Sequence, residues 1–328
     1  MEKSTSNSLI IDQAFVESIV SKDRVAIARA ISIAEKGGGR AITLSNLIHP
    51  HIGQAVRIGI TGPPGAGKST LTAQLAKHVR QQNASVAIVA VDPSSPITSG
   101  AVLGDRVRMD EIENDEDVFI RSMATRGMSG GLSAKACDAA DVLDAAGFDY
   151  IFIESVGIGQ IEVKIEKFVD TTIVVLVPES GDQVQAIKAG LMEIADIYVL
   201  NKADREGSAK VLTGLQSALG IYQDQAWSPQ LVPCVANSGE GTVELLEIIQ
   251  RHREHLSMAG RLSESRTKGI KTRIHDMVNE LVSAALWDED KKKVINDMLP
   301  AVLSGEVSAK QVADMIADNF LSKKKSRD

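Results

Sequence analysis

The stretch that decides the fold is Gly62-Pro63-Pro64-Gly65-Ala66-Gly67-Lys68-Ser69-Thr70, which fits the pattern G-x-x-x-x-G-K-[ST] in full. An apolar run at residues 56–60 precedes it, and apolar residues at helical spacing follow it. A strand, a glycine-rich loop and a helix in this order are typical of a loop that binds nucleotide phosphates. A glycine-rich turn that matches by chance is the alternative, and the flanking patterns disfavour it.

The residue types in this loop suit phosphate binding. Gly62 and Gly67 allow the backbone to turn so that N–H groups converge on phosphate oxygens. The helix that begins near Lys68 adds the partial positive charge of its N-terminal end. Lys68 supplies a full charge for the β- and γ-phosphates, and Ser69 offers a hydroxyl to Mg²⁺. We therefore expect the whole stretch from Gly62 to Thr70 to bind nucleotide.

Composition limits the classes of function. The 328 residues are enough for one large or two moderate domains, and 44% are hydrophobic, as in ordinary globular proteins. A net charge of −7 and only 3% aromatic residues argue against a nucleic-acid binder. Two cysteines are too few for a disulfide framework, which fits a cytoplasmic setting. We find no apolar run long enough for a signal-peptide core or a membrane span.

Residues 56–256 alternate between short apolar runs and helical patterns. Such runs, rich in Val and Ile, are typical of strands in a parallel sheet that helices cover on both faces. The expected strands are 56–60, 86–91, 118–120, 150–153, 172–177, 197–200 and 231–235. We therefore expect an α/β P-loop NTPase domain at 56–256, with an N-terminal helical extension at 1–55 and a C-terminal helical arm at 257–328.

The two flanking segments show helical patterns with their own boundaries. In the first, Asp23 can cap a helix that Gly37 and the next two glycines end, and a second helix is expected from about 41 to 49. In the last, Pro300 is expected to stop one helix. A capping box at 308–311 opens the final helix, with Val312, Met315 and Ile316 facing inward.

The C-terminal arm also carries one long apolar stripe at helical spacing. Its members are Ile270, Ile274, Met277, Leu281 and Ala285. Packing against the chain's own nucleotide domain is one interpretation of this stripe, and contact with a partner protomer is the other.

The motif Asn201-Lys202-Ala203-Asp204 follows an expected strand and fits N-K-x-D. The Asp204 carboxylate can accept hydrogen bonds from guanine N1–H and the exocyclic amine, a donor pair that adenine lacks. Asn201 can bond N7 and brace the loop, while the Lys202 stem can cover the ring. A polar turn that caps a helix is the alternative. The position, well downstream of a phosphate loop, favours guanine selection.

Carboxylates near the phosphate loop point to a metal. Glu154 ends an expected strand, where it can hold a Mg²⁺-bound water, and the Gly157 N–H can sense the γ-phosphate. Asp92 ends another strand, and Asp105 follows in the next loop. Both could approach Mg²⁺, because hard cations prefer carboxylate oxygens. For Asp92 we favour this over a simple cap before Pro93, whereas for Asp105 the two interpretations weigh about equally.

Two kinds of loop complete the expected site. One backbone N–H of the segment Val235, Ala236 and Asn237 is expected to meet the guanine oxygen. Four residues are expected in loops that change shape with nucleotide state, although a helix cap is the alternative for Asp182. These are Arg108, Asp182, Gln185 and Lys188.

Six motifs in one order give the chain a family resemblance. They are the stretches 62–70, 91–96, 104–109, 119–127, 154–160 and 201–204. Together they resemble the MeaB/ArgK/MMAA family, a SIMIBI-class branch of the P-loop GTPases. The resemblance covers the whole chain and implies a chaperone of adenosylcobalamin-dependent methylmalonyl-CoA mutase whose C-terminal arm builds a homodimer. The chain departs from the usual pattern at Val235, where a Ser is common.

The expected function is therefore Mg²⁺-dependent hydrolysis of GTP to GDP and phosphate by a molecular switch. Ile158 stands where common switch GTPases carry a water-positioning Gln, so slow unassisted hydrolysis is expected. Two alternatives remain. One is a metallochaperone GTPase of the same branch, which the scarcity of Cys and of clustered His disfavours. The other is an ATPase linked to basic amino-acid transport, which the motif at 201–204 disfavours.

Overall fold

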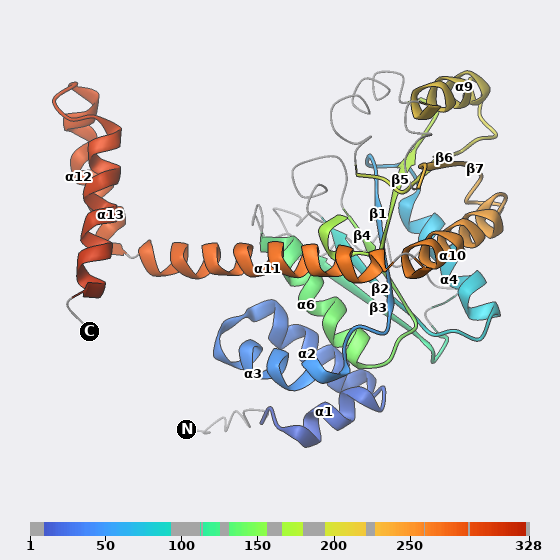
Figure 1. Cartoon of the computed structure of the whole chain (residues 1–328), viewed down its shortest axis with the longest axis horizontal. Coiled ribbons are helices and arrows are strands. Elements are labelled where there is room, and N and C mark those ends of the chain that lie inside the picture. Colours follow the sequence, from blue (N-terminus) through green and yellow to red (C-terminus); the bar gives the residue numbers. More distant parts are fainter. Residues whose placement is uncertain are drawn as a thin grey trace, which may run out of the picture. The chain divides into compact units, whose positions relative to one another are not determined.

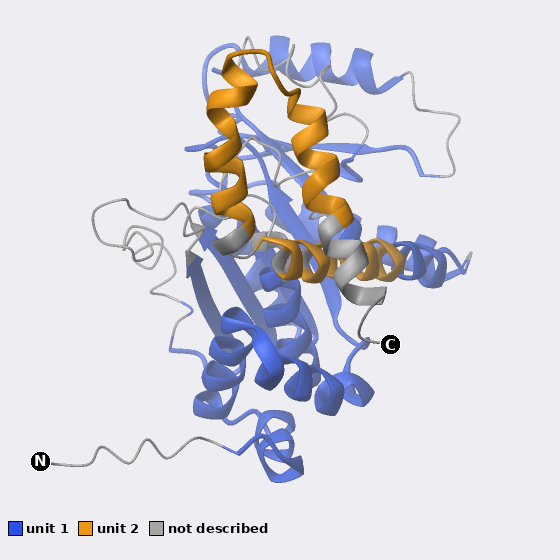
Figure 2. Ribbon diagram, turned by 90° about the vertical axis from the view of Figure 1, so that its left-hand side faces the viewer, with its two compact units in different colours: residues 1–268 blue, residues 269–328 orange. Residues whose placement is uncertain are grey.

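The computed structural model describes residues 10–92, 112, 114–124, 131–155, 166–179, 194–220, 227–258, 260–287 and 289–325. The chain divides into two compact units, residues 1–268 and residues 269–328 (Figure 2). The three-part division at 55/56 and 256/257 stays a prediction.

In the part of unit 1 that the structure describes, seven parallel strands form one sheet in the order β3-β2-β4-β1-β5-β6-β7 (Figure 1). The strands are β1 Val56–Thr61, β2 Val86–Asp92, β3 Val118–Ala124, β4 Tyr150–Glu154, β5 Thr171–Leu176, β6 Ile197–Asn201 and β7 Gln230–Cys234. This sheet, flanked by helices, confirms the α/β P-loop NTPase fold expected from the sequence.

Strand β3 differs most from its predicted bounds, since it continues four residues beyond Ile120. The polar side chains of Arg121 and Ser122 hid this continuation in the sequence. Arg121 is half-buried because its guanidinium pairs with Glu35 at 2.8 Å, on a helix of the N-terminal segment. The edge strand is therefore longer than its apolar run.

Helices cover both faces of the sheet, as Figure 1 shows. One face packs against α6 Gly131–Ala145, which the N-terminal helices α1 Gln13–Val20, α2 Arg24–Lys36 and α3 Gly38–Ile48 cover in turn, and against α9 Ser208–Leu219. The other face packs against α4 Lys68–Gln81 and α10 Thr242–Met258. Val89 belongs to the first core and Ile88 to the second, so this strand is buried on both faces.

Helix α2 begins and ends where the sequence predicts. The Asp23 carboxylate accepts from the Ala26 N–H at 2.7 Å, which confirms the predicted cap of α2. The prediction for α3 was wrong at its start, because the helix begins at Gly38 rather than at residue 41. Gly37, at φ 69°, turns the chain in a single residue and joins the two helices directly.

The short 3₁₀ helices are η1 His49–His51 and η3 Glu166–Phe168.

The C-terminal helices are α11 Arg261–Leu286, α12 Glu289–Leu303 and α13 Ala309–Lys325. The capping box is confirmed, since Ser308 N–H donates to Gln311 Oε1 at 2.8 Å and Gln311 N–H donates to Ser308 Oγ at 3.2 Å. The prediction that Pro300 stops a helix was wrong, because α12 continues to Leu303. Pro300 lies near the end of α12, where few intrahelical hydrogen bonds follow it.

One inward-facing residue of α13 was also predicted wrongly. Val312 and Ile316 are buried as expected, whereas Met315 is 44% exposed. Residues 312 and 316 are one full turn apart, and Met315 lies at the margin of that narrow face.

Buried ion pairs fix the amino end of β1. The Asp144 carboxylate accepts from the backbone N–H groups of residues 53, 54 and 55 at 2.8–3.1 Å and pairs with Arg57 at 2.8 Å. Burial alone would raise the pKa of Asp144, but the Arg57 charge and these hydrogen bonds lower it overall. Asp170 accepts from the Arg57 N–H at 3.0 Å and pairs with Arg266 at 2.8 Å, so the first turns of α11 belong to the same network.

His252 lies buried at this same end of the sheet. Its Nδ1 is 2.9 Å from Thr171 Oγ1, and its ring centroid is 4.6 Å from that of Trp227. Burial, helped by nearby His255, lowers the pKa of His252 to about 4 from an ordinary 6.5.

We expect this buried imidazole to make the fold sensitive to acid. Between the two pKa values the unfolded chain binds the extra proton, so stability falls as pH falls from 6.5 towards 4. His252 should account for a loss of about 2 kcal/mol between pH 7.5 and pH 5. Urea unfolding followed by Trp227 fluorescence, in a Trp287→Phe background, should show this loss reduced in His252→Gln. The exposed His49→Gln is the control, and equal pH slopes for all variants would contradict the assignment.

Candidate functional site

The phosphate loop leaves the carboxyl end of β1, where two glycines are required by close neighbours. Gly62 has φ 141°, and a Cβ there would lie 2.1 Å from the carbonyl oxygen of Val175 on β5. Gly67 has φ 86°, and its Cβ would lie 2.3 Å from Nδ2 of Asn201. At Gly62 the left-handed backbone and the lack of space exclude a side chain, whereas at Gly67 a Cβ would strain the backbone and force the Asn201 carboxamide to move. Neighbouring strands thus determine the shape of the loop.

Lys68 opens helix α4 and is buried with its ammonium group directed at the loop. Its Nζ donates to the carbonyl oxygens of Gly62 at 2.9 Å and Pro63 at 3.2 Å. A buried cation needs such acceptors, since an isolated charge would be costly to desolvate. The charge therefore lies within the curve of the loop.

Ser69 and Glu154 meet beside this lysine. The Ser69 hydroxyl donates to Glu154 Oε1 at 2.7 Å, and both side chains are buried. The contact follows from the register of the sheet, because Glu154 on β4 pairs with Ile60, two residues before the loop. A hydroxyl and a carboxylate are the oxygen donors that Mg²⁺ prefers, so this donor set fits that ion.

The sequence analysis missed Thr72 as a neighbour of this donor set. Its Oγ1 donates to the Lys68 carbonyl at 2.9 Å and lies 3.5 Å from Glu154 Oε2. Residues three apart on a helix share a face, so its spacing from Ser69 could have identified it.

The base motif is tied directly to the phosphate loop. Asn201, the last residue of β6, donates from Nδ2 to the Ala66 carbonyl at 2.7 Å. Lys202 has the left-handed φ of 57° and donates from Nζ to the Gly65 carbonyl at 2.8 Å. Asp204 is exposed, and its carboxylate has no hydrogen bond or ion pair among the residues that the structure describes. Its oxygens are available to a ligand.

The turn after β7 narrows the candidates for the donor to the guanine oxygen. The Val235 N–H donates to the Glu240 carbonyl and the Ala236 N–H to Asn201 Oδ1, both at 3.0 Å. The next N–H, that of Asn237, has no acceptor within the described parts of the chain, while Ser238 and Gly239 both donate to the Val235 carbonyl. Of the three predicted residues, Asn237 is thus the one whose N–H is available.

Several predicted residues lie outside the described residues. These are Asp105, Arg108, Gly157, Asp182, Gln185 and Lys188. For Asp92 the structure gives only the backbone, as the last residue of β2. It lies two residues beyond Ala90, which pairs with Glu154, and so at the carboxyl edge of the sheet.

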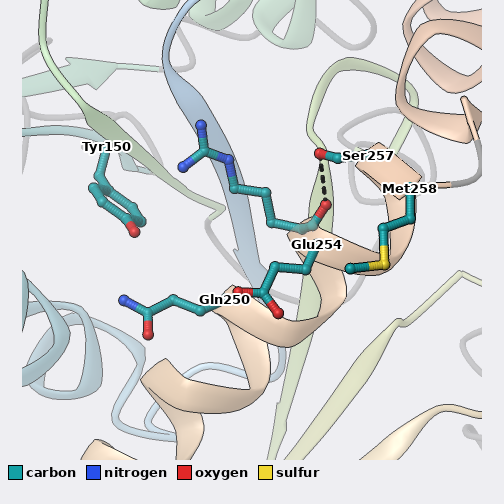
Figure 3. A pocket seen from close by; sticks show the side chains of 6 residues that line it. Tyr150, Gln250, Glu254, Ser257 and Met258 are labelled. Atoms are coloured by element: carbon teal, nitrogen blue, oxygen red, sulfur yellow. Dashed lines mark hydrogen bonds between the residues drawn. The ribbon is translucent and has the colours of Figure 1, made fainter.

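A surface pocket of about 470 Å³ lies away from this site. Tyr150, the first residue of β4, contributes to it, together with Gln250, Glu254 and Ser257 of α10 (Figure 3). The amino ends of the strands form this side of the sheet, whereas the phosphate loop lies at their carboxyl ends. The pocket is therefore not part of the nucleotide site.

The cysteines do not resemble metal ligands. Cys137 and Cys234 are both buried, and neither forms a disulfide. Burial raises the pKa of Cys234 to about 12, so its thiol stays protonated at neutral pH. Among the described residues, no group of three or more His, Cys, Asp or Glu side chains could hold a metal ion. None of the described helices is long and apolar enough to cross a membrane.

Comparison with known proteins identifies the family. A family model described as the methylmalonyl Co-A mutase-associated GTPase MeaB matches residues 27–291. The chain belongs to the MeaB family. It is therefore a GTPase that binds guanine nucleotides, as the motifs predict.

Individual relatives agree with this assignment over nearly the whole chain. A Pyrococcus abyssi protein named as a GTPase is 44% identical over 316 residues, covering 95% of this chain and 97% of its own. The mitochondrial methylmalonic aciduria type A homolog of Mus musculus is 30% identical over 339 residues, covering 95% of this chain and 81% of its own. A crystal structure of a LAO/AO transport system kinase matches with a TM-score of 0.72 and 26% identity, covering 96% of this chain and 100% of that one.

We expect Gly67→Ala to abolish tight nucleotide binding by this MeaB-family GTPase without unfolding it. The new methyl group would displace Asn201 and strain the backbone at φ 86°, so affinity should fall more than tenfold. Titration with a fluorescent GDP analogue measures the loss, and circular dichroism checks the fold. Gly39→Ala, which meets nothing within 4 Å, is the matched control. Unchanged affinity in Gly67→Ala would show that the Asn201 contact does not matter.

Proposed function

We propose that this GTPase is a Mg²⁺-dependent nucleotide switch that gates cofactor loading and protection of an adenosylcobalamin-dependent methylmalonyl-CoA mutase. The buried contact between Ser69 and Glu154 beside Lys68 carries the nucleotide half of this proposal. The description of the family and the name of the mouse relative support the mutase half.

The phosphate end of the site divides its work among a few residues. The loop from Gly62 to Thr70 binds the phosphates through its N–H groups, and Lys68 exchanges its carbonyl acceptors for γ-phosphate oxygens. Ser69 and Glu154 would hold Mg²⁺, with Asp92 and Asp105 as further proposed ligands, and the ion would neutralise charge on the β- and γ-phosphates when bound.

Hydrolysis proceeds by attack of water on the γ-phosphorus, in line with the bond to the bridging oxygen, which leaves with GDP. Lys68 stabilises the charge that develops on the transferred group, and the Gly157 N–H senses the γ-phosphate. Ile158 cannot orient water, so the unassisted reaction is slow.

The base end of the site selects guanine. Asp204 accepts from N1–H and the exocyclic amine, the Lys202 stem covers the ring, and Asn201 braces the loop. The segment from Val235 to Asn237 supplies one backbone donor to O6, and the Asn237 N–H, which has no acceptor in the described part of the chain, favours that residue.

Loops 92–109, 154–160 and 179–188 report the nucleotide state to the mutase. Arg108 lies in the first of these loops, and Asp182, Gln185 and Lys188 lie in the last. The mutase, in binding them, completes the incomplete hydrolytic site.

A transport-linked ATPase is the second candidate, because one structural relative is described as a LAO/AO transport system kinase. The exposed carboxylate of Asp204, which has no partner in the parts of the chain that the structure describes, favours GTP over ATP, since adenine offers it no matching donors. A metallochaperone role would need metal ligands, and the buried, protonated thiol of Cys234 is a poor one.

We further propose that the apolar stripe of α11 forms a homodimer. Ile270, Ile274 and Leu281 are 59%, 55% and 64% exposed, far more than such side chains usually are. Replacing Ile274 and Leu281 by Gln should convert a dimer to a monomer in light scattering, with GDP binding unchanged. Lys271→Gln on the same helix is the control, and a monomeric unaltered protein would refute the dimer.

Asp204→Asn should shift base preference from guanine to xanthine nucleotides. The change replaces one acceptor oxygen by a donor, which suits the O2 of xanthine in place of the guanine amine. Competition of GTP, XTP and ATP against a fluorescent GDP analogue measures the shift. Glu206→Gln, an exposed acid two residues away, is the control. Comparable GTP and ATP affinities in the unaltered protein would contradict the base assignment.

We expect weak unassisted turnover and clear acceleration by the mutase. Single-turnover GTP hydrolysis should be measured with and without the mutase in the unaltered protein and three variants. Gln185→Ala and Lys188→Ala should reduce the acceleration with nearly normal nucleotide affinity, whereas Lys68→Ala should abolish hydrolysis.

Exposed Gln216→Ala on α9 is the control for these loop variants. Full acceleration of both loop variants would show that the switch lies elsewhere, and fast unassisted hydrolysis would remove the need for a partner.

A further inference from the structure

Helix α4 connects the phosphate loop to the turn that follows β7. Lys68 is its first residue, and near its other end His78 Nε2 lies 2.8 Å from Thr242 Oγ1. Thr242 is fully buried, and its hydroxyl lies 2.6 Å from the Gly239 carbonyl. Gln74 approaches the same point, because a Cβ added at Gly239 would lie 3.6 Å from Gln74 Oε1. The helix that binds phosphate therefore also supports the turn.

The direction of these hydrogen bonds can be assigned. A carbonyl oxygen only accepts, so the single proton of the Thr242 hydroxyl goes to Gly239. Thr242 Oγ1 must then accept, and His78 Nε2 carries the donated proton. The two hydrogen bonds run from His78 through Thr242 to Gly239. Together they need a donor at position 78 and a hydroxyl at position 242.

The turn after β7, which these hydrogen bonds support, has little conformational freedom. Val235 bridges Glu240, and Ser238 and Gly239 both donate to the Val235 carbonyl at 3.0 Å. Gly241 has φ 78°, and a Cβ there would lie 2.3 Å from the Pro233 carbonyl oxygen. At its tip, Asn237 keeps an N–H with no acceptor among the described residues. Asn201 bonds one side of this tip through the Ala236 N–H. On the other side, the Gly239 carbonyl is linked to α4 through Thr242.

We propose that His78 is a positioning residue for recognition of guanine O6. Acting through Thr242, it fixes the turn that presents the Asn237 N–H to that oxygen. This inference rests on the proposed base site and adds to it a residue that touches no part of the nucleotide. Asp204 reads the opposite portion of the base edge, so the two contributions can be measured separately.

Two GTP analogues separate the O6 contact from the contact made by Asp204. In 6-thio-GTP a weakly accepting sulfur replaces O6, whereas N1–H and the 2-amino group remain. ITP keeps O6 but lacks the 2-amino group that Asp204 binds. Affinities of both analogues relative to GTP, measured by displacement of a fluorescent GDP analogue, therefore report the O6 contact and the amino contact in turn.

His78→Leu and Thr242→Val should each reduce the advantage of GTP over 6-thio-GTP about three- to tenfold, as expected for one lost hydrogen bond. The advantage of GTP over ITP should stay unchanged. Thr242→Ser keeps the hydroxyl and should retain the normal values. The exposed His49→Leu is the control for loss of a histidine.

The inference is overturned if both variants keep the full advantage over 6-thio-GTP, or if both advantages fall together, which would indicate general loosening of the site. If Asp204→Asn shifts base preference while His78→Leu has no effect, only the inference fails. If the unaltered protein does not prefer GTP to ATP, the proposed base site fails first.

Discussion

The carboxamide of Asn201 is the interaction on which the nucleotide site depends. Its nitrogen bonds the Ala66 carbonyl of the phosphate loop, and its oxygen accepts from the Ala236 N–H of the turn after β7. One buried side chain thus connects three segments that are far apart in the sequence. It also occupies the space next to Gly67, so a Cβ at that position would displace the carboxamide. An Asp at this position could accept but not donate, and the loop contact would be lost.

The opposite end of β1 is fixed by charge rather than by amide contacts. Asp144 and Asp170 bind the backbone there and pair with Arg57 and Arg266. Because these carboxylates are well supplied with donors, the network is satisfied although it is largely buried. The strand that leads into the phosphate loop is therefore held at both ends. Arg266 brings the beginning of α11 into the same network, within unit 1.

Much of the fold could be predicted because local patterns and tertiary structure agree. Apolar runs gave every strand of the described sheet within a few residues, and caps such as Asp23 and Ser308 bond as their motifs predict. The errors have physical causes. Arg121 hid part of β3 because its pairing with Glu35 is a tertiary contact, and Pro300 sits where a helix can tolerate it.

The candidate site was less predictable at the level of single atoms. Motifs indicated Lys68, Ser69 and Glu154, and the register of the sheet brings them together. No motif indicated that the Ala236 N–H donates to the Asn201 side chain, because that contact depends on the spacing of two strand ends. The role of Thr242 was hidden for the same reason, since its partner His78 lies 164 residues away in the sequence.

The two buried cysteines have a practical consequence. Cys137 is 3% exposed and Cys234 is 1% exposed, and they lie in the cores on opposite faces of the sheet, one on α6 and the other at the end of β7. A thiol reagent needs an accessible thiolate, which neither position offers in the folded chain. Modification of these two cysteines by a thiol reagent thus depends on opening of the fold. The modification rate of each thiol therefore measures how often the helices on its side of the sheet separate from the strands.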